Sequence, residues 1–397
     1  MESRPFIPFH VPTIGEEEIA EVTETLRSGW LTTGERTARF ESLFREYTGA
    51  RHALAVNSCT AGLHLALAAA GIRKGDEVIT TPLTFCATVN VILHVGATPV
   101  LADVGADGNL DPASVAARVT TRTRAIIPVH LGGLPCRMDE IWQIAQRHRL
   151  RVIEDAAHAT DAQYHGLAPG SAGTPSTAAA FSFYATKNIT TGEGGMVTTN
   201  DAAMAERMRM LCLHGITKDA WNRYSEKGSW YYEVMEAGFK YNLSDVQSAI
   251  GLHQLAKIER MHALRAAYAG VYQRRLSAVD EIELPPSCEY GRHAWHLYPI
   301  RLNLEKLDVG RDEFITELRA RGIGTSVHFI PIPLHPFFRK WVRLKRNSCP
   351  RAMALYHRLI SLPLYPAMTM DQVQYITDSI KAIAQEHCRR RVVAMAI

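Results

Sequence analysis

Short apolar runs alternate with helical stretches between about residues 50 and 200. The apolar runs are predicted as strands and lie at residues 53–56, 77–80, 98–101, 125–129, 151–155, 179–183 and 195–199. Residues 61–70 and 138–147 are predicted as helices, and Asp111-Pro112 marks the start of another. Strands that alternate with helices predict an α/β fold, in which helices flank both faces of a mostly parallel sheet.

The C-terminal part has a different pattern. Residues 243–275 are predicted to be largely helical, residues 296–300 and 325–329 to be strands, and residues 311–321 to be a helix that ends at Gly322. These elements suit a smaller α+β domain. Because 397 residues exceed what one core usually holds, we predict a large domain at 1–260, with an N-terminal segment for substrate and dimer contacts, and a small domain at 261–397.

Composition and charge narrow the class of protein. The net charge of +4 gives no reason to propose nucleic acid or a membrane as a partner. No apolar run is long enough to span a bilayer, and the first residues lack the apolar core of a secretory signal, so a cytoplasmic protein is expected. The seven cysteines are scattered and form no CxxC pair, so neither a metal site nor a disulfide framework is predicted.

Lys187 stands between a predicted hydrophobic strand and a loop that contains Gly192, Gly194 and Gly195. A lone lysine in such a loop is mostly solvated, but these glycines allow the backbone to turn tightly against a ligand. An amine in a partly desolvated cleft has a lowered pKa, which favours the neutral nucleophile. Such a lysine can condense with an aldehyde and later move protons.

Asp155 ends the predicted strand at residues 151–155, where parallel sheets bind their ligands. It faces the crevice if Ile153 shares its face of the strand, and Glu154 then lies on the opposite side. Pyridoxal phosphate (PLP) requires a carboxylate in such a place to keep its pyridine nitrogen protonated. A carboxylate that caps the next helix is the alternative interpretation.

A polar turn at residues 57–62 precedes a predicted helix, so its free N–H groups and the helix dipole can bind a phosphate, although a simple helix cap fits equally well. Phe85 follows the second strand and can stack on a flat cofactor, although an isolated Phe is more often part of a core. No GxGxxG or Walker A sequence is present, which disfavours dinucleotide and NTP folds. A phosphate turn, a ring, an acid and a lysine, each at a strand end, together indicate PLP.

On these motifs the sequence resembles the DegT/DnrJ/EryC1/StrS family of sugar aminotransferases, which are PLP-dependent transferases of fold type I. The resemblance covers nearly the whole chain and includes residues 29–34, 75–79, 127–130, 154–158, 181–184, 187–190, 192–195, 240–245 and 321–324. Within the family the chain is most similar to enzymes that aminate C4 of UDP-4-keto sugars, notably the 4-amino-4-deoxy-L-arabinose branch.

The resemblance implies roles for individual residues. Lys187 is the catalytic Schiff-base lysine and proton shuttle, Asp155 pairs with the pyridine nitrogen, and His158 approaches the ring hydroxyl. The other implied cofactor contacts are Thr60, Ala61 and Ser182 at the phosphate, Phe85 stacked on the ring where the arabinose branch carries Trp, and Asn242 reaching the phosphate of a neighbouring subunit. Implied substrate contacts are Trp30, Leu31, Thr32, His328 and Phe329. A homodimer with two shared active sites is therefore expected.

Other interpretations stay open for some of these residues. Trp30 can serve interface packing, His328 can be a structural histidine, and His158 can cap the following turn. The aromatic segment 221–236 can be a substrate-covering loop or an ordinary packed excursion.

The implied activity is a ping-pong transamination that moves an amino group from L-glutamate, through pyridoxamine phosphate, to a nucleotide-linked keto-sugar, with a UDP- or dTDP-4-keto sugar expected. A keto-cyclitol or other carbocycle of antibiotic biosynthesis is the alternative substrate. A pyridoxamine-dependent sugar dehydratase would carry histidine in place of Lys187, and a non-catalytic regulator on this fold would be expected to lose Lys187 or Asp155.

Overall fold

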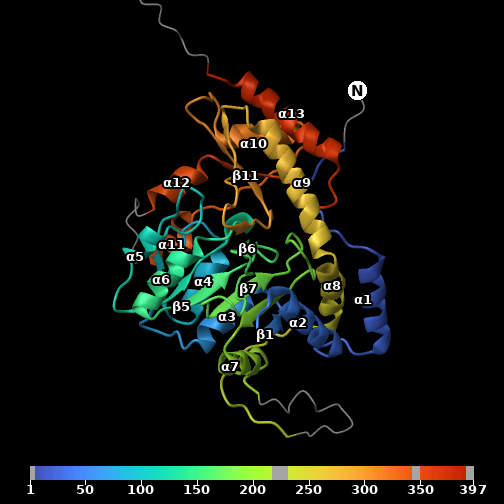
Figure 1. The fold of residues 1–397 in the computed structure, drawn as a ribbon, viewed down its shortest axis with the longest axis vertical. Helices are drawn as coiled ribbons and strands as arrows, with labels where there is room; N and C mark the ends of the chain where they lie inside the picture. Colours follow the sequence, from blue (N-terminus) through green and yellow to red (C-terminus); the bar gives the residue numbers. More distant parts are fainter. Residues whose placement is uncertain (1–4, 217–230, 342–348, 390–397) are drawn as a thin grey trace, which may run out of the picture.

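A computed structural model describes residues 5–216, 231–341 and 349–389 of the chain (Figure 1). Its centre is a seven-stranded sheet in the order β1-β8-β7-β5-β4-β2-β3. The strands are β1 (His52–Val56), β2 (Glu77–Thr80), β3 (Thr98–Leu101), β4 (Thr123–Ile127), β5 (Arg151–Asp155), β7 (Ala178–Ser182) and β8 (Gly195–Thr199). Only β8 runs antiparallel to its sheet neighbours, β1 and β7. The mostly parallel sheet predicted from the sequence is confirmed.

Helices cover both faces of this sheet (Figure 1). On one face, α3 (Cys59–Ala69), α4 (Cys86–His94) and α7 (Ala202–Cys212) pack against strand residues that include Val78, Ile153 and Val197. The other face is covered by α2 (Glu35–Thr48), α5 (Pro112–Ala116), α6 (Met138–His148) and α8 (Asp245–Ala256). Because both faces are buried, a central strand such as β7 is buried along its whole length and lacks polar alternation.

The C-terminal part contains a three-stranded antiparallel sheet in the order β12-β11-β9. Its strands are β9 (Ile282–Glu283), β11 (Tyr298–Leu302) and β12 (Leu359–Leu362), and the helices α9 (Ile258–Leu276), α10 (Arg311–Ala320) and α13 (Met370–Glu386) pack against it. The remaining elements are α1 (Glu16–Ser28), α11 (Pro336–Trp341), α12 (Pro350–Tyr356), the short strands β6 (Gln163–Tyr164) and β10 (Gly291–Arg292), and single 3-10 turns at Leu131–Gly133 and Ile332–Leu334.

Two details differ from the sequence-based expectations. The strand expected at residues 325–329 is wrong: within those residues the structure has a single isolated bridge, between Ser326 and Ser361. Pro331 and Pro333 follow closely and lack N–H donors, so they cannot extend a ladder there. The strand expected from residue 296 begins at Tyr298.

The division near residue 260 stays a prediction. Residue 260 lies inside α9, which runs from beside α8 to the C-terminal sheet (Figure 1). Ile7, from the N-terminal segment, forms a bridge with Ile323 and belongs to the C-terminal core. In the described part of the chain, no helix combines the length and the apolar character that crossing a membrane requires.

Candidate active site

Asp155 is the last residue of β5, at the carboxyl end of the large sheet. Its buried carboxylate accepts hydrogen bonds from the Thr88 hydroxyl at 2.8 Å and from the Ala157 backbone N–H at 3.2 Å. The Cys59 thiol lies 3.9 Å from Oδ1, the same oxygen that accepts from Ala157. Burial raises the pKa of Asp155, and the hydrogen bonds and the charge of Lys187 oppose that shift. A buried carboxylate with few compensating charges is well placed to receive a cationic partner.

The strand geometry predicted around Asp155 is confirmed. Ile153 packs on the face that α3 and α4 cover, and the two helices also supply Cys59 and Thr88 beside Asp155. Glu154 points to the opposite side, where its carboxylate lies 2.9 Å from Nε2 of His130 and accepts the N–H of Gly170 at 3.0 Å. The two adjacent acids therefore have separate roles.

Lys187 lies in the loop that connects β7 to β8. The loop is closed by hydrogen bonds between Phe183 and Gly194 and between Thr191 and Phe183, each at 2.9 Å, and Lys187 N–H donates to Tyr184 O at 2.9 Å. Burial lowers the pKa of the Lys187 amine to about 8, and the neighbouring Cys59 and Asp155 oppose the shift. Its neutral fraction near pH 7 is therefore larger than that of an ordinary lysine, which suits this amine to act as a nucleophile and a base.

The turn before α3 has the features of a phosphate site. Ser58 caps α3 by accepting the Ala61 N–H at 3.1 Å, and Thr60 lies with Ala61 in the first turn of the helix. Ser182, at the end of β7, pairs with Gly195, and a Cβ at Gly195 would come within 2.6 Å of the Cys59 N atom. Only glycine lets β8 begin this close to the turn. The predicted residues Thr60, Ala61 and Ser182 thus lie around one helix N-terminus, whose dipole favours an anion.

His158 presents a hydrogen-bond donor beside this site. Its Nδ1 accepts the Gly132 N–H at 3.2 Å, and burial lowers its pKa well below the usual value, so the ring is neutral with its proton on Nε2. Its ring packs against His296, with centroids 4.4 Å apart, and stacks on Phe329 at 5.7 Å. Phe85 is 60% exposed and lies 6.1 Å from Phe329. Phe85 is thus free to stack on a cofactor and is not a core residue.

His328 directly precedes Phe329 in the chain and lies on the same side of the site as Phe329. Its Nδ1 is 2.9 Å from the Ser361 hydroxyl, and its ring stacks on Phe9 at 5.4 Å. Burial and the charge of Lys187 lower its pKa to about 4. Burial, together with the charges of Arg265 and Lys187, also lowers the pKa of His10 to about 4, and no motif in the sequence pointed to this histidine.

A second group of predicted residues lies at the start of α8. Asn242 donates to the Thr33 hydroxyl at 2.7 Å and pairs with Val56, next to the phosphate turn. The Thr32 carbonyl accepts from the Asp245 N–H at 3.1 Å. Trp30 and Leu31 are 40% and 47% exposed, and the indole N–H of Trp30 donates to Thr33 O. Their contacts with a substrate or a second subunit stay predictions. In the aromatic segment, residues 221–230 lie outside the described residues.

These residues fit PLP as a group. Lys187 supplies an amine that can bond to its aldehyde, Asp155 a carboxylate for its pyridine nitrogen, and the N-terminus of α3 a dipole end that favours its phosphate. Thr88 also belongs to this arrangement, because it orients the Asp155 carboxylate. Thr88 also hydrogen-bonds to Thr84 at 2.7 Å, and no sequence motif indicated its role.

Comparisons with known proteins agree with this chemistry. The sequence model of the DegT/DnrJ/EryC1/StrS aminotransferase family matches residues 12–381. The chain is 51% identical over 382 residues to the spore coat polysaccharide biosynthesis protein SpsC of Bacillus subtilis, covering 96% of this chain and 97% of SpsC.

Solved structures show the same fold and cofactor. Spr1654 from Streptococcus pneumoniae, described as a sugar aminotransferase and solved in its PLP and PMP forms, shares 32% identity with a TM-score of 0.89 in the PLP form, over 96% of this chain and 99% of that one. PseC of Helicobacter pylori, an aminotransferase involved in the biosynthesis of pseudoaminic acid, shares 31% identity with a TM-score of 0.88, over 96% and 100%. The chain therefore belongs to the DegT/DnrJ/EryC1/StrS aminotransferase family and is a PLP-dependent aminotransferase of fold type I.

Proposed function

We propose that the enzyme moves an amino group from L-glutamate to a nucleotide-linked 4-keto sugar, with UDP or dTDP as the nucleotide. The observation that carries the proposal is a buried Lys187, whose pKa is lowered to about 8, beside a buried Asp155 and near the exposed ring of Phe85. The names of SpsC and PseC, which refer to polysaccharide and pseudoaminic acid biosynthesis, support a sugar substrate.

Three residues of this chain have separate roles in the transfer of the amino group. Bound PLP supplies an aldehyde that carries the amino group and a ring that takes up the electrons of a broken C–H bond. Neutral Lys187 removes the proton from the carbon that bears the amino group of the donor, and in the second half-reaction its Nζ returns a proton to the sugar carbon. Asp155 would hold the proton of the pyridine nitrogen, and the Nε2–H of His158 would donate a hydrogen bond to the ring oxygen of the bound cofactor.

The intact lysine also separates this proposal from its alternatives. A dehydratase of this fold would carry histidine in place of Lys187, and a regulator without catalysis would have no need for an amine whose pKa is lowered to about 8. A keto-cyclitol substrate is distinguished by experiment.

The substrate prediction is tested with a panel of keto substrates. The purified enzyme with PLP and L-glutamate is incubated with UDP-, dTDP- and GDP-4-keto sugars and with a keto-cyclitol, and amino products are detected by mass spectrometry. Activity is expected on a UDP- or dTDP-4-keto sugar, at least about tenfold above the other substrates, as one or two lost hydrogen bonds to a nucleotide would produce. Activity on the cyclitol alone would refute the sugar assignment.

We further propose that two copies of the chain form a homodimer with shared active sites. The N-terminal segment exposes an unusual number of large apolar side chains, including Ile19, Leu26, Trp30 and Leu31. Covering such side chains is the usual role of a partner surface. Sedimentation equilibrium at micromolar concentration is expected to give twice the mass of the chain, and Trp30→Ala with Leu31→Ser to weaken the association. A monomer in that experiment would disprove the dimer.

A further inference from the structure

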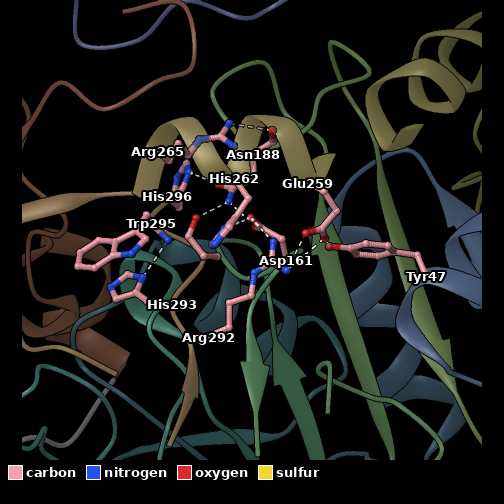
Figure 2. Close-up of polar contacts among 11 residues, drawn as sticks. Tyr47, Asp161, Asn188, Glu259, His262, Arg265, Arg292, His293, Trp295 and His296 are labelled. Carbon is pink, nitrogen blue, oxygen red and sulfur yellow. Dashed lines mark hydrogen bonds and ion pairs between the residues drawn. The ribbon is translucent and has the colours of Figure 1, made fainter. Parts of the chain in front are cut away.

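The residue that follows Lys187 uses all of its side-chain hydrogen-bonding groups (Figure 2). Nδ2 of buried Asn188 donates to Oδ1 of Asp161 at 2.5 Å and to the carbonyl of Ala294 at 2.9 Å, and its Oδ1 lies 3.0 Å from Nδ1 of His296. Its backbone carbonyl accepts a hydrogen bond from Arg265 at 2.8 Å. The peptide next to the catalytic lysine is therefore held from four directions.

Asp161 is the charged end of this network, and its side chain is fully buried. Its Oδ2 lies 2.8 Å from Nδ1 of His262 and 3.9 Å from the guanidinium of Arg292. Arg292 also pairs with Glu259 at 2.9 Å. The cluster brings together segments that lie far apart in the sequence: residues after β5 and β7, helix α9, and the residues from β10 to β11 (Figure 2).

The direction of the Asn188 amide follows from its partners. A carboxylate and a backbone carbonyl can only accept hydrogen bonds, so the NH₂ group must face Asp161 and Ala294, and the carbonyl oxygen must face His296. Nδ1 of His296 must therefore carry a proton and donate. If the Asn188 amide were flipped, its carbonyl oxygen would face the carboxylate of Asp161, and two acceptors would lie against each other.

The protonation of His296 follows in turn. Burial and the nearby His158, Lys187, His328 and His10 lower its pKa well below the usual value, so the ring is neutral and has one N–H. Because Nδ1 holds that proton, Nε2 is a bare acceptor. The ring lies against His158, which is part of the active site, with centroids 4.4 Å apart.

We propose that Asp161 is a positioning residue for amino transfer, which acts through Asn188 to hold His296, whose ring packs against His158, with its proton on Nδ1 and an unprotonated Nε2. That nitrogen accepts a hydrogen bond from an N–H or O–H donor of the substrate. The opposite tautomer would present a donor and repel the same group. This inference rests on the proposed function, because that function supplies the substrate whose N–H or O–H group binds to Nε2.

The primary test reads the tautomer in the protein without substrate. Imidazole ¹⁵N chemical shifts of ¹⁵N-histidine-labelled enzyme, with and without PLP, distinguish protonated from bare ring nitrogens, and His296→Asn assigns the signals. Wild type is expected to show His296 protonated at Nδ1. Asp161→Ala and Asn188→Ala are each expected to raise the population of the Nε2–H tautomer, and Asp161→Asn, which retains an oxygen, to restore part of the wild-type signal.

Kinetics supply the second readout. Asp161→Ala and Asn188→Ala should each lower kcat by about tenfold, the loss expected for one hydrogen bond, and the double variant should fall no further than either single variant, because the two residues act through one path. Glu259→Gln removes a carboxylate from the same cluster without touching Asn188 and should leave the tautomer and kcat unchanged.

Several outcomes would overturn the inference. These are a wild-type His296 protonated at Nε2, an unchanged tautomer in both alanine variants, or additive losses in the double variant. If Asp161→Ala does not fold, Asn188→Ala alone carries the test, since it leaves the pairs of Asp161 with His262 and Arg292 in place. The NMR measurement uses no sugar, so its failure is distinguishable from failure of the substrate panel.

Discussion

Lys187→Ala is expected to lower turnover by more than about 10⁴-fold, because the variant loses both the nucleophile and the acid–base group. Apoprotein of the variant is also expected to form no covalent adduct with PLP. Stopped-flow absorbance after mixing with PLP, followed by borohydride reduction and mass spectrometry of the chain, measures both effects. In wild type, the rate of covalent capture should rise with pH and level off above about 8, because burial lowers the pKa of Lys187 to about 8 and only the neutral amine attacks.

Lys306→Ala is the matched control, since Lys306 is a surface lysine that pairs with Asp280 at 2.8 Å. It should retain wild-type turnover and capture. Two results would contradict the assignment. One is a Lys187→Ala chain that still gives a borohydride-reducible adduct. The other is a wild-type rate of covalent capture that keeps rising with pH up to the usual pKa of a lysine.

The central sheet was predictable because its strands are buried on both faces. The apolar runs of β2, β3, β5 and β8 stand out from the polar segments around them, and all four occur where the sequence predicts strands. The start of α5 was predictable for a local reason: Asp111 caps it by accepting the Ala113 N–H, and Pro112 occupies its first turn. Local patterns of this kind depend on neighbours within a few residues.

The C-terminal part depends more on distant partners. Residues 325–329 are predicted as a strand, but within the described residues their single bridge is with Ser361, and the side chain of His328 also reaches Ser361. Ile7 joins the core of the C-terminal sheet through Ile323, which lies more than three hundred residues away. No periodicity within either segment indicates such contacts.

The candidate site shows the same contrast. The period of two along β5 predicted that Asp155 lies on the same side as Ile153 and Glu154 on the opposite side, and the contacts of these residues confirm it. The network of Asp161, Asn188 and His296 has no sequence signal, because its members are separated by up to 135 residues (296 − 161) and meet only when α9 and β11 close over the β7–β8 loop.

Asp155→Asn is expected to lower kcat by about 10³-fold, because asparagine cannot hold the positive charge that develops at the pyridine nitrogen. Asparagine keeps the size of the side chain and an oxygen that can accept from Thr88, so the fold should persist. The apoprotein of the variant should unfold at the same temperature as wild type or higher. Burial raises the pKa of Asp155, which means that the ionised carboxylate costs stability at neutral pH, and the uncharged amide removes that cost.

Glu154→Gln supplies a direct comparison, because the two acids are adjacent in sequence and both are buried. Glu154 serves the opposite side of β5, where it pairs with His130 at 2.9 Å and holds the Gly170 N–H at 3.0 Å. Its replacement should lower the melting temperature, since breaking a buried pair leaves a group unsatisfied, but change kcat by less than about tenfold. Asp155→Asn should therefore lose kcat and keep its melting temperature, whereas Glu154→Gln should lose melting temperature and keep most of its kcat. If Asp155→Asn instead lost stability and kept its activity, the carboxylate would be structural, and its assigned role at the pyridine nitrogen would be refuted.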